Sequence, residues 1–162
     1  MRRVSHLKFL LSVAILAVMG HGEAMAQSHL EGPCDIYHAY GVKCVAAHST
    51  TRILYSKYNG PLYQVMRESD GQTLDVGTVP GGYADAAAQD AFLDGTIGYI
   101  TVIYDQTGHG NDLTQAPPGT FKGPAKGEFN TLPIADMAPV VLDGHNVYGA
   151  YFMPGMGLRN NN

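Results

Sequence analysis

The sequence has little of what several classes of protein require. Its 162 residues include only 10 Lys+Arg against 14 Asp+Glu, a net charge of −4, and no Trp. Because a nucleic-acid-binding protein is expected to have a basic footprint, this acidic chain is predicted to bind no nucleic acid. The two cysteines, Cys34 and Cys44, lack the second pair that a zinc ribbon needs, so no metal site is expected.

No apolar run is long enough to cross a membrane. The longest, Phe9 to Met19, has 11 residues, against about 20 for a spanning helix. A basic start precedes it, and Ala-Met-Ala at 24–26 is a small-x-small cleavage site, so residues 1–26 are predicted to be a secretory signal peptide. Cleavage near Ala26 removes three basic residues and one acid, which lowers the net charge to −6. We expect a secreted or periplasmic protein that binds no membrane after cleavage.

The mature part, residues 27–162, is short enough to be a single domain. Gly (20) and Pro (9) make up almost a fifth of the chain, which indicates a folded protein with many turns. Few stretches have Leu, Glu, Lys or Ala at helical spacing, so an all-β domain with long loops is favoured over a helical bundle.

Hydrophobic patterns predict the main elements. Residues 62–68 alternate, with Tyr63, Val65 and Arg67 on one face and Leu62, Gln64 and Met66 on the other. A turn at 69–71 leads to a returning strand, and 96–104, which is apolar on both faces, is predicted to be a central strand. The other expected elements are one short helix near 84–93, a helical turn at 35–40, an ambiguous segment at 45–58, and strands at 140–142 and 147–152.

The cysteines leave two alternatives open. An exported protein can form a disulfide, and the pair Cys34 and Cys44 would close a loop of about eleven residues worth roughly 3 kcal/mol in the chain-entropy model. The alternative is two free thiols.

A long stretch from Asp105 to Pro139 is dense in Gly, Pro, Asn and Asp, and loops of this length are often functional. No catalytic constellation stands out within it. Aspartates in turns usually bond their own backbone, and the histidines are scattered. Asp105, His109 and Asn111 are the polar candidates in this loop.

Residues 104–115 resemble part of a known fold. They read Tyr-Asp-Gln-Thr-Gly-His-Gly-Asn-Asp-Leu-Thr-Gln, which is similar to a strand and turn of concanavalin-A-like lectin and glucanase sandwiches. Residues 139–144, Pro-Val-Val-Leu-Asp-Gly, resemble the strand and turn that follow it there. The resemblance implies a lectin-like β-sandwich of the jelly-roll type, here incomplete.

Further blocks resemble one family within that fold, in the same order along the chain. They are residues 44–52, 58–65, 69–71, 81–84, 86–90, 113–119 and 121–124. From Gly32 to about Asn161 the chain is similar to the catalytic domain of α-L-arabinofuranosidase B, glycoside hydrolase family 54. In that family the first disulfide falls where Cys34 and Cys44 stand.

The resemblance implies a secreted glycosidase that removes terminal α-L-arabinofuranosyl units from arabinoxylan and arabinan. It implies a retaining mechanism, with one carboxylate as nucleophile and a second as general acid/base. It implies no metal or organic cofactor, and an arabinose-containing polysaccharide as the partner.

Two departures from the family pattern shape what we expect. Fungal members have a second, short-range disulfide where this chain has Leu93 and Gly98, so turn chemistry alone is expected to hold the loop 94–98. The family's nucleophile, its acid/base, its vicinal disulfide and its β-trefoil are expected beyond Asn162. No catalytic residue is therefore assigned to this chain.

We interpret residues 27–162 as the N-terminal part of an arabinofuranosidase catalytic sandwich, a truncated form without the catalytic carboxylates. A non-catalytic, lectin-like carbohydrate-binding module is the alternative, and a partial chain completed by another polypeptide is a third. Because such a part leaves strands without neighbours, we expect poor solubility for the isolated chain.

Overall fold

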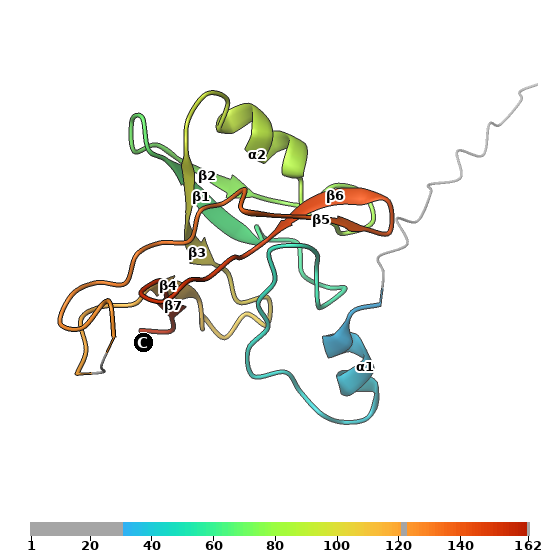
Figure 1. Cartoon of the computed structure of the whole chain (residues 1–162). Helices are drawn as coiled ribbons and strands as arrows, with labels where there is room; N and C mark the ends of the chain where they lie inside the picture. The colour runs from blue at the N-terminus through green and yellow to red at the C-terminus, as the bar shows by residue number, and fades with distance from the viewer. Residues whose placement is uncertain (1–30, 121–122, 162) are drawn as a thin grey trace, which may run out of the picture.

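The computed structural model describes residues 31–120 and 123–161 and arranges them as two antiparallel sheets with two short helices (Figure 1). The predicted signal peptide, residues 1–26, lies outside the described residues. Within the described ranges, no helix has the length and apolar character needed to span a bilayer. The elements in chain order are α1 (Pro33–Ala39), β1 (Tyr63–Arg67), β2 (Thr73–Val76), α2 (Ala86–Phe92), β3 (Gly98–Ile103), β4 (Leu113–Gln115), β5 (Ala138–Leu142), β6 (His145–Gly149) and β7 (Leu158–Arg159).

The larger sheet has the strand order β2-β1-β3-β4-β7, with all neighbours antiparallel. The predicted hairpin at 62–76 is confirmed as β1 and β2, in which Tyr63 pairs with Val76. The predicted central strand is confirmed as β3, which lies between β1 and β4. A bulge between Gln64 and Val65 shifts the pairing of β1 with β3.

The alternation predicted for β1 holds over residues 63–66. Tyr63 and Val65 are fully buried, whereas Gln64 and Met66 are only half-buried. Leu62, assigned to the other face, is also fully buried, and Arg67, assigned to the face of Tyr63 and Val65, is only half-buried. Leu62 precedes the strand, so the two-residue period does not apply to it, although its N–H still donates to the carbonyl of Val76.

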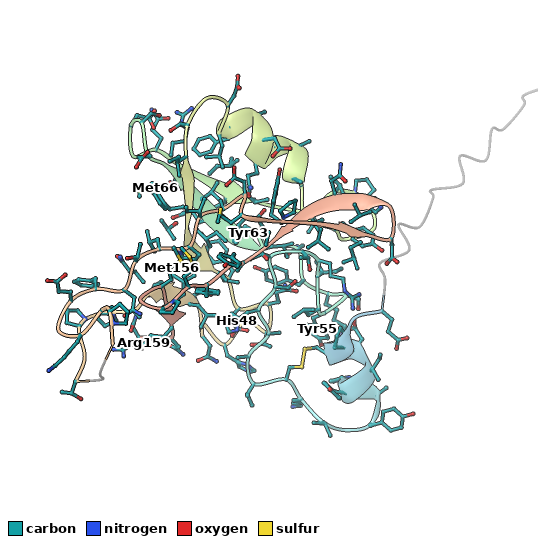
Figure 2. All side chains as sticks on the ribbon, in the orientation of Figure 1. His48, Tyr55, Tyr63, Met66, Met156 and Arg159 are labelled. Atoms are coloured by element: carbon teal, nitrogen blue, oxygen red, sulfur yellow. A yellow bond between two sulfur atoms is a disulfide. The ribbon has the colours of Figure 1, made fainter. Side chains whose placement is uncertain are left out.

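The second sheet is the hairpin of β5 and β6, near the predicted strands 140–142 and 147–152 but with different bounds. Its turn has positive φ at Asp143 (48°) and Gly144 (82°), the combination that a type I′ hairpin turn requires. Val147 of β6 is 1% exposed and packs in the same core as residues of β1 and β3. The two sheets therefore share one apolar core, with Tyr63 at its centre (Figure 2).

Helix α2 confirms the helix predicted near 84–93 and contacts both β2 and β6. Asp85 is the N-cap, and its carboxylate accepts from the N–H of Ala88 at 3.0 Å. Gln89 is fully buried, accepts from the hydroxyl of Tyr63 at 2.7 Å and donates to the carbonyl of Ala135 at 3.3 Å. These bonds satisfy a polar side chain that would otherwise be costly to bury.

Three expectations need correction. A second helix, α1, stands where only a turn at 35–40 was expected, because Pro33 favours the first helical turn and Asp35 accepts from the N–H of Gly32 at 2.8 Å. The ambiguous segment 45–58 is irregular, apart from a single bridge between Arg52 and Tyr83. The long loop 105–139 contains β4, a strand too short to be visible in the sequence pattern.

Candidate functional site

The polar loop that follows β3 is organised around Asp105. Its Oδ1 accepts hydrogen bonds from the N–H groups of Ala47 and Thr107, both at 3.0 Å. Its Oδ2 accepts from the Thr107 hydroxyl at 2.7 Å and from the N–H of Asn111 at 3.2 Å. The residue is 5% exposed. Asp105 therefore fixes the shape of its own loop and ties it to a segment 58 residues earlier in the chain.

The ionisation of Asp105 fits this role. Burial by itself would raise the pKa of the carboxyl, but the hydrogen bonds from Thr107, Ala47 and Asn111 outweigh it and lower the pKa to about 2. The group is thus a carboxylate with its oxygens already occupied by donors. A general acid needs a raised pKa, so this environment is the opposite of what acid catalysis requires.

The other two sequence candidates converge on the same backbone. His109 donates from Nδ1 to the carbonyl of Val45 at 3.2 Å, and Asn111 donates from Nδ2 to the same carbonyl at 2.9 Å. The carbonyl of Asn111 accepts from Nε2 of His48 at 2.7 Å. The structure therefore brings Asp105, His109 and Asn111 together at residues 45–48. Their hydrogen bonds hold the loop after β3 against that segment.

Gln106 is a structural residue of this loop that sequence reasoning missed. It is 2% exposed, accepts from the N–H of Leu54 at 2.6 Å and donates to the carbonyl of Arg52 at 3.3 Å. Its own N–H donates to the carbonyl of Ala47 at 2.9 Å. No local signal could have shown this, because its partners lie more than fifty residues away.

The disulfide between Cys34 and Cys44 is present, so the alternative of free thiols is excluded. It joins Cys34, within α1, to Cys44 and so closes residues 34–44 into a loop, which lies beside Tyr55 (Figure 2). Asp35 links the same helix to Ser56, because its carboxylate accepts hydrogen bonds from the N–H of Ser56 at 2.8 Å and from its hydroxyl at 2.7 Å. Burial would raise the pKa of Asp35, but these bonds and that from Gly32 lower it.

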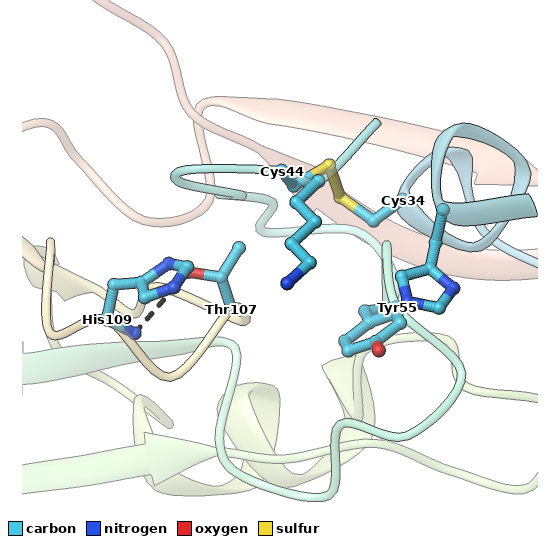
Figure 3. A pocket seen from close by; sticks show the side chains of 7 residues that line it. Cys34, Cys44, Tyr55, Thr107 and His109 are labelled. Atoms are coloured by element: carbon cyan, nitrogen blue, oxygen red, sulfur yellow. Dashed lines mark hydrogen bonds between the residues drawn. A yellow bond between two sulfur atoms is a disulfide. The ribbon is translucent and has the colours of Figure 1, made fainter. Parts of the chain in front are cut away.

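Between these parts lies a cavity of about 260 Å³, called here the disulfide cavity. Figure 3 shows His109 and Thr107 on one side of it and Tyr55 on the other, with the disulfide at its rim. The residues that line it are Cys34, His38, Lys43, Cys44, Tyr55, Thr107 and His109. Of these, the sequence analysis singled out only the cysteines and His109. The expected disulfide could have pointed to Lys43, because this residue lies next to Cys44 in the loop that the disulfide closes.

Most aspartates in the described ranges accept a hydrogen bond from another protein group. Beyond Asp35 and Asp105, this holds for Asp70, Asp75, Asp85, Asp90, Asp112 and Asp143. Among residues 31–120 and 123–161, no three His, Cys, Asp or Glu side chains gather as metal ligands would. The carboxylates of this part of the chain are thus mainly occupied in structural contacts.

Comparison with known sequences places this architecture among enzymes. Residues 33–162 match the family described as "Alpha-L-arabinofuranosidase B, catalytic". The probable α-L-arabinofuranosidase B of Aspergillus fumigatus is 60% identical over 131 residues, which are 80% of this chain and 26% of that protein. The α-L-arabinofuranosidase of Hypocrea jecorina is 58% identical over 130 residues, with the same shares. The chain therefore spans about a quarter of the length of the curated relatives it matches.

Solved structures give the same result in three dimensions. A crystal structure of an arabinofuranosidase complexed with arabinofuranosyl-α-1,2-xylobiose superposes with a TM-score of 0.76 at 54% identity, over 81% of this chain and 27% of that one. A family 54 α-L-arabinofuranosidase soaked with a cyclic sulfate inhibitor gives 0.75 at 54% identity, over 80% and 27%. The predicted β-sandwich class is confirmed, with two antiparallel sheets that do not close into a barrel.

Proposed function

This chain belongs to the family of α-L-arabinofuranosidase B catalytic domains, and from that premise we propose that residues 33–162 form the N-terminal part of an enzyme that removes terminal α-L-arabinofuranosyl groups from arabinoxylan and arabinan. The observation that supports this most is the superposition, at 54% identity, on an arabinofuranosidase complexed with an arabinofuranosyl-xylobiose. The partner is then an arabinose-containing polysaccharide, and the reaction is a retaining hydrolysis.

A retaining glycosidase needs two carboxyl groups about 5–5.5 Å apart, one as nucleophile and one as general acid/base. We place both outside residues 33–162. In support, Asp35 and Asp105 each accept several hydrogen bonds, and these bonds lower the pKa of both carboxyl groups. This part of the chain then supplies the scaffold, including the central strand β3 and the loop that Asp105 organises.

Export is a further part of the proposal. The pattern at residues 1–26 is that of a cleavable signal peptide with its site near Ala26. The disulfide between Cys34 and Cys44 supports an oxidising destination, because disulfides persist in secreted and periplasmic proteins and are rare in the cytosol. A polysaccharide substrate outside the cell agrees with that destination.

The proposed function is tested with a hybrid enzyme, in which a segment of a relative is exchanged for the corresponding segment of this chain. Residues 33–162 replace the corresponding segment of the Aspergillus fumigatus relative, and arabinose release from p-nitrophenyl α-L-arabinofuranoside is measured. Because 60% of the aligned residues are identical, the hybrid should fold and hydrolyse the substrate. A hybrid that folds, as judged by a cooperative melt, but releases no arabinose would contradict the proposal.

The placement of the catalytic carboxylates has its own test. The chain purified by itself should release no arabinose from the same substrate, because a glycosidase without both carboxyl groups loses the covalent route and the leaving-group acid together. Turnover by this chain that a single Asp or Glu substitution abolishes would overturn that placement. Binding of arabinoxylan without turnover would favour the lectin-like alternative.

A further inference from the structure

The disulfide cavity concentrates basic side chains in a chain that is acidic as a whole. His38 of α1, Lys43 of the disulfide loop and His109 of the polar loop all line it, and none of the described residues lining it is Asp or Glu. The net charge of the full chain is −4. A lysine in a cavity without acidic side chains is the pattern expected of a site for an anionic group.

Lys43 is available for such a group. The one ion pair that the structure shows among the described residues joins Arg67 to Asp70, so Lys43 is paired with no carboxylate there. Asp35 is the nearby acid on α1, and its oxygens already accept from Ser56 and Gly32. An ammonium group without a partner, at the wall of a cavity, attracts an anion without having to break an existing bond.

Hydrogen bonds fix which nitrogen of His109 faces the protein. The Thr107 hydroxyl donates to Asp105 and so can only accept from Nδ1 of His109, which lies 2.8 Å away. The Val45 carbonyl, 3.2 Å from the same nitrogen, can also only accept. Nδ1 therefore has the proton, and Nε2 is left without a hydrogen-bond partner among the described residues. Asp105, through Thr107, acts as a positioning residue for this ring.

The remaining wall suits a small cyclic molecule. Tyr55 lies across the cavity from His109 (Figure 3), and a tyrosine provides a flat apolar ring with a polar tip. The volume of about 260 Å³ is just below the range of about 300–1,000 Å³ for drug-sized ligands. A single sugar unit matches that size better than an extended oligosaccharide does.

We propose that the disulfide cavity binds a carboxylate-bearing sugar unit, a uronic acid, with Lys43 at the carboxylate, Nε2 of His109 accepting from a sugar hydroxyl, and Tyr55 at the sugar ring. That the carboxylate belongs to a sugar rests on the proposed function, whereas the preference for an anion rests on the cavity alone. The cavity would then give the protein a preference for polysaccharides that have acidic side groups.

The test is ligand-observed NMR of the full chain with D-galacturonate, with D-xylose and acetate as comparison ligands. We expect galacturonate to bind in the millimolar range, with xylose and acetate much weaker. Loss of the charged partner in Lys43→Gln should weaken galacturonate at least about tenfold, the usual size for a charge-assisted hydrogen bond. Lys126→Gln, which removes the same charge from an exposed position that does not line the cavity, should leave binding unchanged.

Three results would overturn the proposal: no binding of galacturonate to folded chain, equal weakening by both lysine substitutions, or acetate binding as tightly as galacturonate. The last result would leave an anion site without sugar recognition. The hybrid enzyme separates this proposal from the proposed function, because its p-nitrophenyl substrate has no carboxylate for the cavity to bind. An active hybrid with no galacturonate binding would reject the cavity proposal alone.

Discussion

Asp105 is the residue on which the geometry of the polar loop depends most. It is nearly buried and accepts from the backbone at three separate positions, of which Ala47 is distant in sequence. Sequence analysis could select Asp105, His109 and Asn111 as polar residues of one loop. It could not place them against residues 45–48, because no pattern in either segment encodes a contact across 58 positions.

Asp105→Asn should destabilise the protein by about 3 kcal/mol, because the amide nitrogen would face donors and the charge that strengthens the remaining bonds would be lost. Urea unfolding followed by circular dichroism measures the change. Asp94→Asn, at an exposed turn position, is the matched control and should stay within about 0.5 kcal/mol of the parent. Equal effects of the two substitutions would contradict the role given to Asp105.

Acid should destabilise the chain as the pH falls from 3.8 towards about 2. The pKa of Asp105 is about 2 in the folded state, against an ordinary value of 3.8 for an aspartate. Between these values the unfolded state binds more protons than the folded state, so stability is fully present above pH 3.8 and is lost as the pH falls through about 2. Asp35, whose pKa is also lowered, adds to the same trend.

The free energy of unfolding measured from pH 6 to pH 2 tests this prediction. The parent should lose stability steadily below pH 4, and Asp105→Asn should show a shallower loss because the titrating group is gone. Parallel curves for the two proteins would show that the carboxyl of Asp105 titrates alike in the folded and unfolded states.

Among the elements, most of those with a local signal were predicted, whereas those defined by pairing alone were not. The alternation at 62–68 and the Asp-capped, alanine-rich segment at 84–93 mark β1 and α2 within the chain itself. Strands β4 and β7 have three and two residues, too few for a period. They exist because Thr114 pairs with both Val102 and Arg159, and such partners cannot be found from local sequence.

The turn between α2 and β3 lies between Leu93 and Gly98, the positions at which the family resemblance implies a disulfide in fungal members. An added Cβ on Gly98 would collide with the side chain of Leu93, so the two positions adjoin. The turn is held by the bond from the N–H of Thr96 to the carbonyl of Leu93 at 3.0 Å, with Gly95 at φ 74°. This geometry agrees with a loop maintained by backbone hydrogen bonding.

Leu93→Cys combined with Gly98→Cys should therefore form a disulfide on oxidation. Closing so short a loop should make the oxidised double variant about 2 kcal/mol more stable than its reduced form in the chain-entropy model. The comparison of the two redox forms removes the separate cost of losing the buried Leu93 side chain. A double variant that stays reduced under oxidant, by thiol titration, would show that the two positions do not adjoin.

On the scale of the whole molecule, several large apolar side chains are exposed to solvent. Along β5 and the segment after β6, large apolar residues are 42–69% exposed. They are Met137, Val140, Val141, Tyr151, Phe152 and Met153, called here the apolar ribbon. Exposed apolar side chains that cluster in two short segments favour self-association.

The purified chain should accordingly bind the dye ANS and self-associate as its concentration rises. Val141→Lys, at the most exposed position of the apolar ribbon, should reduce both effects without lowering Tm. Asn146→Lys adds the same charge to the paired position on β6 and should reduce them less, because no apolar side chain is removed. Fluorescence and analytical ultracentrifugation give the two readouts, and equal effects would point to net charge instead.

The central claim is that residues 33–162 are a working part of an arabinofuranosidase catalytic domain. Its most direct test is arabinose release from p-nitrophenyl α-L-arabinofuranoside, measured side by side for the isolated chain and for the hybrid with the Aspergillus fumigatus relative. We predict turnover by the hybrid, with a kcat/KM within about tenfold of that relative, and none by the isolated chain. A folded hybrid that is inactive, or an isolated chain that is active, would contradict the account.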